Sequence, residues 1–199
     1  METSLHDLRI EAVVRQLVNS GAGSVLDLGC GRGALLKHLL PVAQFTRLIG
    51  IDIDMNALVQ ARQALEIDLL RPNPRISVSY GSFAEENREL VGFDAAVLLE
   101  TIEHIDAGHL PRVERAVFAG MRPSLVLVTT PNREYNPVHG LARGERRHPG
   151  HRFEWTRAQF RHWASGVAER NGYRVTFDDL GWPQPEIGGS SQMASFSVK

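Results

Sequence analysis

The chain has 199 residues, 43% of them hydrophobic and 23% charged, which is the composition of one ordinary globular domain over 1–199. No apolar stretch is long enough to cross a membrane, and the N-terminus lacks the pattern of a signal peptide. The single cysteine, Cys30, excludes an internal disulfide and favours a reducing, cytoplasmic location. A formal net charge of −1 excludes a surface that is basic throughout for tight nucleic-acid binding.

Apolar periodicity predicts strands that alternate with helices along most of the chain. We expect an amphipathic helix over 5–18, then helices over 34–40, 55–70, 107–120 and 157–169, the last one capped by Thr156. The expected strands cover 24–28, 48–51, 76–80, 93–98, 125–129, 173–177 and 194–198. This order predicts an α/β fold with a mostly parallel seven-stranded sheet, helices on both faces and an antiparallel pair at one edge.

The alternation is interrupted after Pro131, where an insertion of about 131–156 shows no period and is rich in Arg, His, Pro and Gly. A stretch of this length in a compact domain is more often functional than decorative, so we expect it to serve substrate and metal binding. Arginine can bind phosphate with two parallel hydrogen bonds. The arginines of the insertion therefore fit an RNA-facing surface, but they also fit an ordinary solvated loop. Those between 133 and 161 are Arg133, Arg143, Arg146, Arg147, Arg152, Arg157 and Arg161.

A glycine-rich turn between the first strand and the next helix predicts a nucleotide-type ligand at this edge of the sheet. Asp27 precedes the turn, and Asp52, roughly twenty residues later, can accept hydrogen bonds from ribose hydroxyls. The acid directly before the glycines resembles motif I of class I methyltransferases and favours them over dehydrogenases. There it helps hold the amino-acid end of S-adenosylmethionine, and Ser82 follows the third strand where such enzymes contact adenine. The glycines are Gly29, Gly31 and Gly33.

A second group of polar residues, Glu100, Glu103 and His104, follows the strand over 93–98 and therefore also lies at the ligand-binding edge. If this segment is helical, the three side chains share one face and make a plausible divalent-metal site. A solvated helix face is the alternative, but the apolar neighbours indicate the rim of a core, where two uncompensated carboxylates would repel each other. Candidates for a fourth ligand are His148 and His151, with weaker cases for His109, His139 and His162.

Taken together, these motifs resemble Hen1, the family of 3′-terminal RNA ribose 2′-O-methyltransferases. The segments that match are 4–9, 27–33, 81–82, 100–104, 130–136 and 151–157, which span nearly the whole catalytic domain of that family. The Glu–x–x–Glu–His motif followed by His–x–Phe–Glu–Trp–Thr–Arg is highly specific, and the opening segment is closer to the bacterial branch. The resemblance implies a Rossmann-like class I methyltransferase fold. It also implies that the catalytic metal ligands are Glu100, Glu103, His104 and His151.

The resemblance further implies that S-adenosylmethionine is the cofactor and the 3′ end of RNA the partner. A divalent cation would bind the vicinal 2′- and 3′-hydroxyls and activate the 2′-oxygen. The cation would be Mg²⁺ or Mn²⁺, and the imidazole-rich ligand set favours Mn²⁺ or Co²⁺ for tighter binding. Bacterial relatives act in RNA repair beside a kinase–phosphatase–ligase protein, whereas plant and animal relatives protect small silencing RNAs.

Two alternatives stay open from the sequence. A metal-dependent methyltransferase of a small catechol-like diol would use the same metal chemistry, although the arginine-rich insertion argues against it. A non-catalytic module that binds RNA or the cofactor is a different class of protein. The presence of all four expected metal ligands argues against this second alternative.

Overall fold

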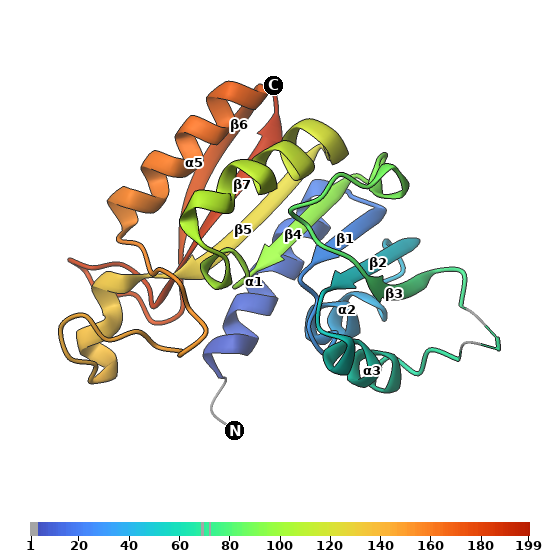
Figure 1. Cartoon of the computed structure of the whole chain (residues 1–199), viewed down its shortest axis with the longest axis horizontal. Coiled ribbons are helices and arrows are strands. Elements are labelled where there is room, and N and C mark those ends of the chain that lie inside the picture. The colour runs from blue at the N-terminus through green and yellow to red at the C-terminus, as the bar shows by residue number, and fades with distance from the viewer. Residues whose placement is uncertain (1–3, 69, 72) are drawn as a thin grey trace.

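The computed structural model describes residues 4–68, 70–71 and 73–199. Its centre is a seven-stranded sheet in the order β3-β2-β1-β4-β5-β7-β6 (Figure 1). β1 to β5 run parallel, whereas β7 pairs antiparallel with both β5 and β6, which confirms the predicted mixed sheet. The strands are β1 Ser24–Leu28, β2 Arg47–Asp52, β3 Ile76–Tyr80, β4 Ala95–Leu99, β5 Leu125–Pro131, β6 Tyr173–Leu180 and β7 Ser191–Val198.

Helices cover both faces of the sheet, as predicted, because successive residues of a strand point to opposite sides. On β1, Val25 packs with α1, α2 and α3, while Leu26 and Leu28 pack with the helical segment 107–121 and with α5. The α-helices are α1 Leu5–Ser20, α2 Ala34–Leu39, α3 Met55–Ala64, α4 Leu110–Val113 and α5 Arg157–Asn171. The other helical elements are η1 Arg88–Leu90, η2 Ile102–His104, η3 Ala107–His109, the π-helix η4 Glu114–Met121 and η5 Arg133–His139.

Helix ends follow local sequence signals in some places and tertiary packing in others. Thr156 caps α5 as predicted, since its side chain accepts from the backbone N of Gln159 in a capping box. The prediction of one helix over 55–70 was wrong, because α3 ends at Ala64 and Glu66 takes a left-handed backbone with φ 53°. Position 69 of that prediction lies outside the described residues. The apolar pattern in the sequence extends past the end of α3, because Leu65 packs into the core although it lies outside the helix. The pattern alone therefore overestimates the length of the helix.

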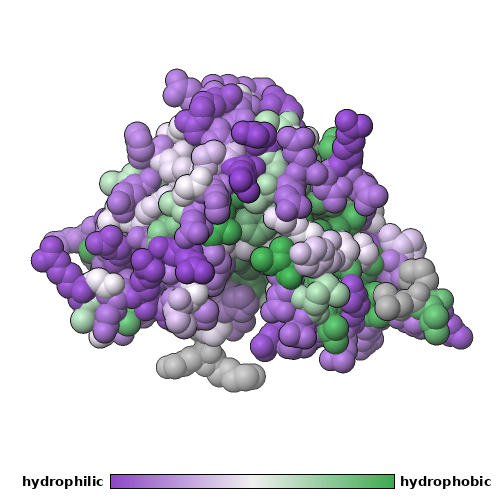
Figure 2. All heavy atoms as spheres, viewed as in Figure 1, coloured by the Kyte–Doolittle hydropathy of each residue, from purple (hydrophilic) through white to green (hydrophobic). Residues whose placement is uncertain are grey.

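The view in Figure 2 shows a mostly hydrophilic surface, with hydrophobic side chains gathered over α3 towards the lower right. Met55 and Val59 of α3 are among the exposed large hydrophobic residues, as is Ile53 just before it. None of the helices in the described ranges is both long and apolar enough to cross a membrane.

Candidate active site

The carboxyl ends of β1, β2, β4 and β5 meet at one edge of the sheet, where strand order reverses between β1 and β4. Two neighbouring cavities of about 290 Å³ and 330 Å³ open there, and both are lined by Gly29 and Glu100. The first also has apolar walls from Ile53, Phe83 and Ile105, which suit an adenine ring. The second is lined by Asp27 and the glycine turn.

The glycine turn is shaped by a close approach and by a carboxylate. Gly29 has φ 84°, and a Cβ there would lie 2.1 Å from Cγ2 of Thr101, so no other residue fits. The backbone N of Gly31 donates to Oδ2 of Asp52 at 2.8 Å, while Oδ1 of Asp52 accepts from the backbone N of Asp54. Asp52 therefore holds the turn in place and also lines the first cavity, where a ribose would lie.

Asp27 is a buried carboxylate at the second cavity. Its side chain is 2% exposed, and its Oδ2 has no hydrogen-bond partner within the described part of the chain. Burial and the nearby Asp52 raise the pKa of Asp27 to about 7, because both disfavour the charged carboxylate. A cationic ammonium group entering the cavity would supply the missing partner, which fits the predicted contact with the amino-acid end of S-adenosylmethionine.

Two further carboxylates each have one oxygen held by a neighbour and one without a partner. Oε2 of Glu100 pairs with Nη2 of Arg9 at 2.9 Å, and Oε2 of Glu103 accepts from Oγ1 of Thr130 at 3.1 Å. Both Oε1 atoms are buried without a partner among the residues described. Burial and the charge of Glu100 raise the pKa of Glu103 well above its usual value. A divalent cation would relieve the repulsion and satisfy both orphaned oxygens, so these residues fit a metal.

Three histidines form a cluster of their own that does not include Glu100 or Glu103, although His104 lines the first cavity together with Glu100. His104, His148 and His151 each offer a ring nitrogen within 4.8 Å of the others. Nδ1 of His151 lies 2.6 Å from Oε1 of Glu154, so a proton on Nδ1 leaves Nε2 free as a metal ligand. Nδ1 of His148 accepts from the backbone N of Gly150, which places the proton of neutral His148 on Nε2. Hydrogen bonding therefore favours His151 over His148 as the fourth ligand.

The helical arrangement considered for Glu100, Glu103 and His104 is not what the structure shows. Glu100 directly follows β4 and takes a left-handed conformation with φ 52°, and only Ile102–His104 forms a single 3₁₀ turn. The chain reverses at Glu100, whose backbone N donates to both O and Oγ1 of Thr129. Glu100 and His104 line the first cavity, whereas Glu103 is fully buried and is not part of that lining. A left-handed non-glycine residue is strained, and such strain is characteristic of functional sites.

The sequence missed several residues that complete the site, and one predicted residue is placed differently. Oγ of Ser82 accepts from the backbone N of Ala84, and the neighbouring Phe83 lines the cavity. Arg9 belongs to a matching motif, but nothing in the pattern indicated that it pairs with Glu100. The remaining histidines lie outside the cluster, and His139 instead bonds Oγ of Ser190.

Comparisons with known proteins identify the family and the fold. A family model described as a methyltransferase domain matches residues 26–125. The small RNA 2′-O-methyltransferase of Gallus gallus is 36% identical over 88% of this chain and 49% of its own length. That of Arabidopsis thaliana is 32% identical over 94% of this chain and 22% of its own length. The crystal structure of the methyltransferase domain of bacterial CtHen1 has a TM-score of 0.89 and 39% identity, covering 98% of this chain and 100% of that domain.

The chain belongs to the Hen1 family. Its fold is also shared by more distant S-adenosylmethionine-dependent methyltransferases, such as one from Archaeoglobus fulgidus with a TM-score of 0.65 at 16% identity. The chain spans about half the length of the vertebrate Hen1 proteins that it matches. The predicted family and the Rossmann-like fold are therefore confirmed.

The arginines of the insertion divide into two groups in this Hen1 domain. Arg147 is partly buried, and its side chain bonds Asn136, Ser190 and the backbone O of Asn132. Arg157 pairs with Glu134 at 2.8 Å. These two arginines hold the insertion together, so they are not available to face RNA. The exposed members are Arg133, Arg143, Arg146, Arg152 and Arg161.

Replacing Glu154 with glutamine is expected to weaken Mn²⁺ binding by about 10- to 100-fold, the usual effect of removing a partner that orients a metal-binding histidine. Calorimetric titration with Mn²⁺ measures this loss. Glu145→Gln, an exposed neutral substitution in the same loop, is the matched control and should bind like wild type. Equal affinity of the Glu154→Gln variant and wild type would mean that His151 needs no such orientation.

The same carboxylate predicts a pH effect on stability. Burial raises the pKa of Glu154, but hydrogen bonds from His151, Asn136 and the backbone N of Arg147 outweigh it and lower that pKa to about 2. The stabilisation is therefore complete above the ordinary pKa of 4.5 and is lost as pH falls from 4.5 towards 2. Denaturant unfolding across this range should show a steeper acid loss for wild type than for Glu154→Gln.

Proposed function

We propose that this chain methylates the 2′-hydroxyl of the 3′-terminal ribose of RNA. S-adenosylmethionine would be the methyl donor, and a divalent cation would be held by Glu100, Glu103, His104 and His151. The observation that carries the proposal is the pair of buried, unpartnered carboxylate oxygens of Glu100 and Glu103. It is supported by the cluster of His104 and His151, of which His104 lines the cofactor cavity together with Glu100. An acidic pair of this kind is costly to fold unless a cation occupies it.

Two carboxylates and two imidazoles suit Mn²⁺ or Co²⁺ better than Mg²⁺, which prefers oxygen ligands, although Mg²⁺ can serve where it is abundant. When bound, the cation would orient the ribose hydroxyls and lower the pKa of the attacking one. Binding to both vicinal hydroxyls would explain selectivity for a 3′ end, because an internal ribose or a 3′-phosphate lacks a free 3′-hydroxyl.

The other side chains of the site would position the methyl donor and the metal ligands. Asp27 would pair with the ammonium group of the methyl donor, and Asp52 would accept from its ribose. Glu100 lines both cavities, so it marks the place where donor and acceptor would meet. Arg9 and Thr130 fix the rotation of the two glutamates by holding one oxygen of each. Holding two reactants in contact in this way supplies much of the acceleration in group transfer.

We further propose a bacterial role in repair or protection of RNA ends. Identity to the bacterial CtHen1 domain is 39%, above the 34% and 36% of the mouse and chicken relatives. A solved Pnkp1/Rnl/Hen1 RNA repair complex has a chain with the same fold, at a TM-score of 0.73 and 18% identity. A kinase–phosphatase–ligase partner is therefore the one to test first.

The test is methyl transfer from labelled S-adenosylmethionine, with Mn²⁺, to a short RNA with a free 3′ end. We expect transfer to this RNA and none to the same RNA with a 2′-deoxy or 3′-phosphate terminus. A free nucleoside should be a poor acceptor. Equal labelling of the 2′-deoxy RNA would show that the methyl goes elsewhere, and efficient methylation of a catechol or nucleoside would favour a small-molecule enzyme.

A further inference from the structure

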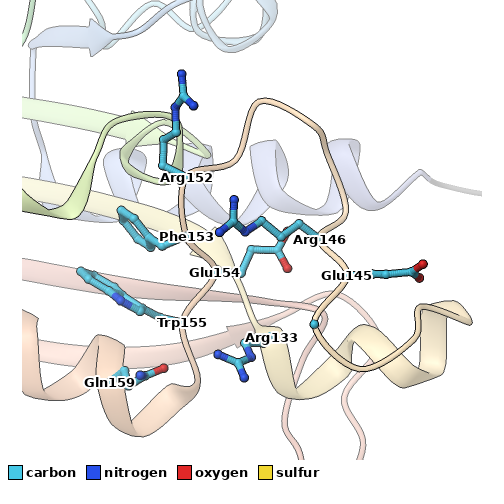
Figure 3. Close-up of a pocket in the computed structure, with 9 residues that line it drawn as sticks. Arg133, Glu145, Arg146, Arg152, Phe153, Glu154, Trp155 and Gln159 are labelled. Atoms are coloured by element: carbon cyan, nitrogen blue, oxygen red, sulfur yellow. The ribbon is translucent and has the colours of Figure 1, made fainter.

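A third cavity, of about 290 Å³, lies in the insertion beside the metal-binding histidines and is distinct from the two cavities of the cofactor site. Its wall includes Arg133, Arg146 and Arg152, together with Phe153, Trp155 and Gln159. Phe153 and Trp155 stack with ring centroids 4.3 Å apart and close one side of it. Figure 3 shows Arg133 and Arg146 on the inner side of the loop, with Arg152 extending away from them at the rim.

The positive charge of this cavity is offset only in part by its two carboxylates, and none of its arginines is ion-paired in the described structure. Among the described residues, none of the three arginines has a carboxylate within salt-bridge distance, in contrast to Arg9, Arg157 and Arg170. Glu154 also lines the cavity, but its oxygens already accept from His151, Asn136 and the backbone N of Arg147.

The remaining acid of the wall is not ion-paired with the arginines either. One oxygen of Glu145 accepts from the backbone N of Ala142, and Figure 3 shows its side chain extending away from the other labelled side chains. Guanidinium groups without a counterion in a concave site are the usual receptor for phosphate, onto which they fork with two hydrogen bonds.

The cavity shares a wall with the proposed metal site. Nη1 of Arg146 donates to the backbone O of His151 at 2.8 Å. The backbone N of Arg152 donates to the backbone O of Glu103 at 2.7 Å, and Glu154 contacts the His151 ring while lining the cavity. A strand whose last ribose lay at His104 and His151 would therefore bring its preceding linkage to these arginines.

We propose that this cavity binds the phosphodiester that joins the terminal ribose to the nucleotide before it, with Arg133 and Arg146 as the donors. This inference rests on the proposed function, because it assumes that the terminal ribose lies at the metal ligands. Phosphate contacts fix the register of a nucleic acid without reading its sequence. The cavity would therefore hold the 2′-oxygen in line for transfer irrespective of the terminal base.

Arg133 is the residue to change, since its side chain forms no hydrogen bond or ion pair within the described structure and only its backbone N is engaged, by O of Trp155. Arg133→Gln is expected to weaken binding of a 5′-fluorescein single-stranded RNA about tenfold and to lower the slope of log affinity against log salt by about 1. Fluorescence anisotropy measures both, and Arg133→Lys should restore the salt slope but only part of the affinity, because an ammonium group keeps the charge without the two parallel hydrogen bonds. Arg174→Gln is the matched control, because Arg174 is exposed at the start of β6. That position is level with the start of β5, at the end of the sheet away from the insertion.

A chemically edited RNA identifies which phosphate is bound. An uncharged methylphosphonate at the last linkage should weaken wild-type binding by tenfold or more, on the order of the loss of one or two phosphate contacts, and should cause a clearly smaller further loss in Arg133→Gln, since only the contact with Arg146 is then left to remove. A methylphosphonate several linkages upstream should instead add to the loss in the variant. Additive losses at the last linkage, or no RNA binding by wild type, would overturn the proposal.

These outcomes are separable from those of the proposed function. If RNA binds with this dependence on the last linkage but no methyl is transferred, the phosphate site stands and the catalytic proposal fails. If methyl is transferred to the terminal 2′-hydroxyl while binding ignores the last linkage, the catalytic proposal stands and the phosphate site is wrong. Binding of an acidic peptide at Arg133 with no effect of the RNA linkage would likewise overturn the phosphate assignment.

Discussion

Replacing His151 with glutamine is expected to lower kcat/KM for the proposed terminal methyl transfer by about three orders of magnitude, because several kcal/mol of transition-state stabilisation would depend on the proposed metal. Nε2 of His151 is the nitrogen left free by the contact of Nδ1 with Glu154. The variant should still bind S-adenosylmethionine, since His151 is absent from the linings of both cofactor cavities. Transfer assays with Mn²⁺ and calorimetry with the cofactor measure the two properties separately.

His148→Gln is the matched control for this experiment. His148 lies in the same cluster, but its Nδ1 accepts from the backbone N of Gly150 and its ring is exposed. We expect the His148→Gln variant to bind Mn²⁺ with wild-type affinity and to keep most of its activity. Loss of Mn²⁺ binding in both variants would assign three imidazoles to the site. Loss only in His148→Gln would show that His148, and not His151, is the metal ligand.

Asp27→Asn is expected to have opposite effects on binding and on stability. Burial and Asp52 raise the pKa of Asp27 to about 7. Above that pH the charged form of Asp27 therefore lowers the free energy of unfolding of the ligand-free protein. The neutral amide should therefore stabilise the ligand-free domain by about 1–3 kcal/mol at pH 8. Affinity for S-adenosylmethionine should fall about 100-fold, because the ammonium group loses its buried counterion.

The sign of the pH dependence follows from the direction of the shift. Between the ordinary pKa of 3.8 and the raised value of about 7, the folded state binds more protons at Asp27 than the unfolded state does. The contribution of Asp27 to stability is therefore present below pH 3.8 and is lost as pH rises through 7. Denaturant unfolding at pH 5 and pH 8 should show this loss in wild type and in the exposed control Asp178→Asn, but not in Asp27→Asn. A variant that is less stable than wild type at pH 8 would contradict the expectation.

The elements that the sequence predicted well are those with local signals. The short apolar runs of the buried strands, the glycine turn after β1 and the cap at Thr156 each depend on residues close together in the chain. The position of Glu100, Glu103 and His104 at the sheet edge followed for the same reason, since they come directly after a strand. The order of the last two strands within the sheet depends on long-range pairing and was predicted only as an antiparallel edge.

The details of the site that were missed all depend on contacts between distant segments. Arg9 reaches Glu100 across 91 positions of sequence, as Ser191 does from the other end of the chain. The left-handed backbone at Glu100 is imposed by Thr129 of the neighbouring strand, and no property of a glutamate predicts it. The division of the arginines into structural and exposed members could not be predicted either, because it depends on which of them meet a carboxylate or a carbonyl in the folded loop.

The pairing of Arg9 with Glu100 has a thermodynamic consequence for the first helix. Arg9 also bonds Oγ of Ser191 through its Nε at 2.8 Å, so α1 is attached to two strands at the edge where the methyl donor and the acceptor would meet. Any event that changes how firmly α1 docks must then change the affinity of the site, and occupancy of the site must change the docking by the same free energy. The first helix and the candidate site are thus linked reciprocally, so a variant that loosens α1 should also weaken the site.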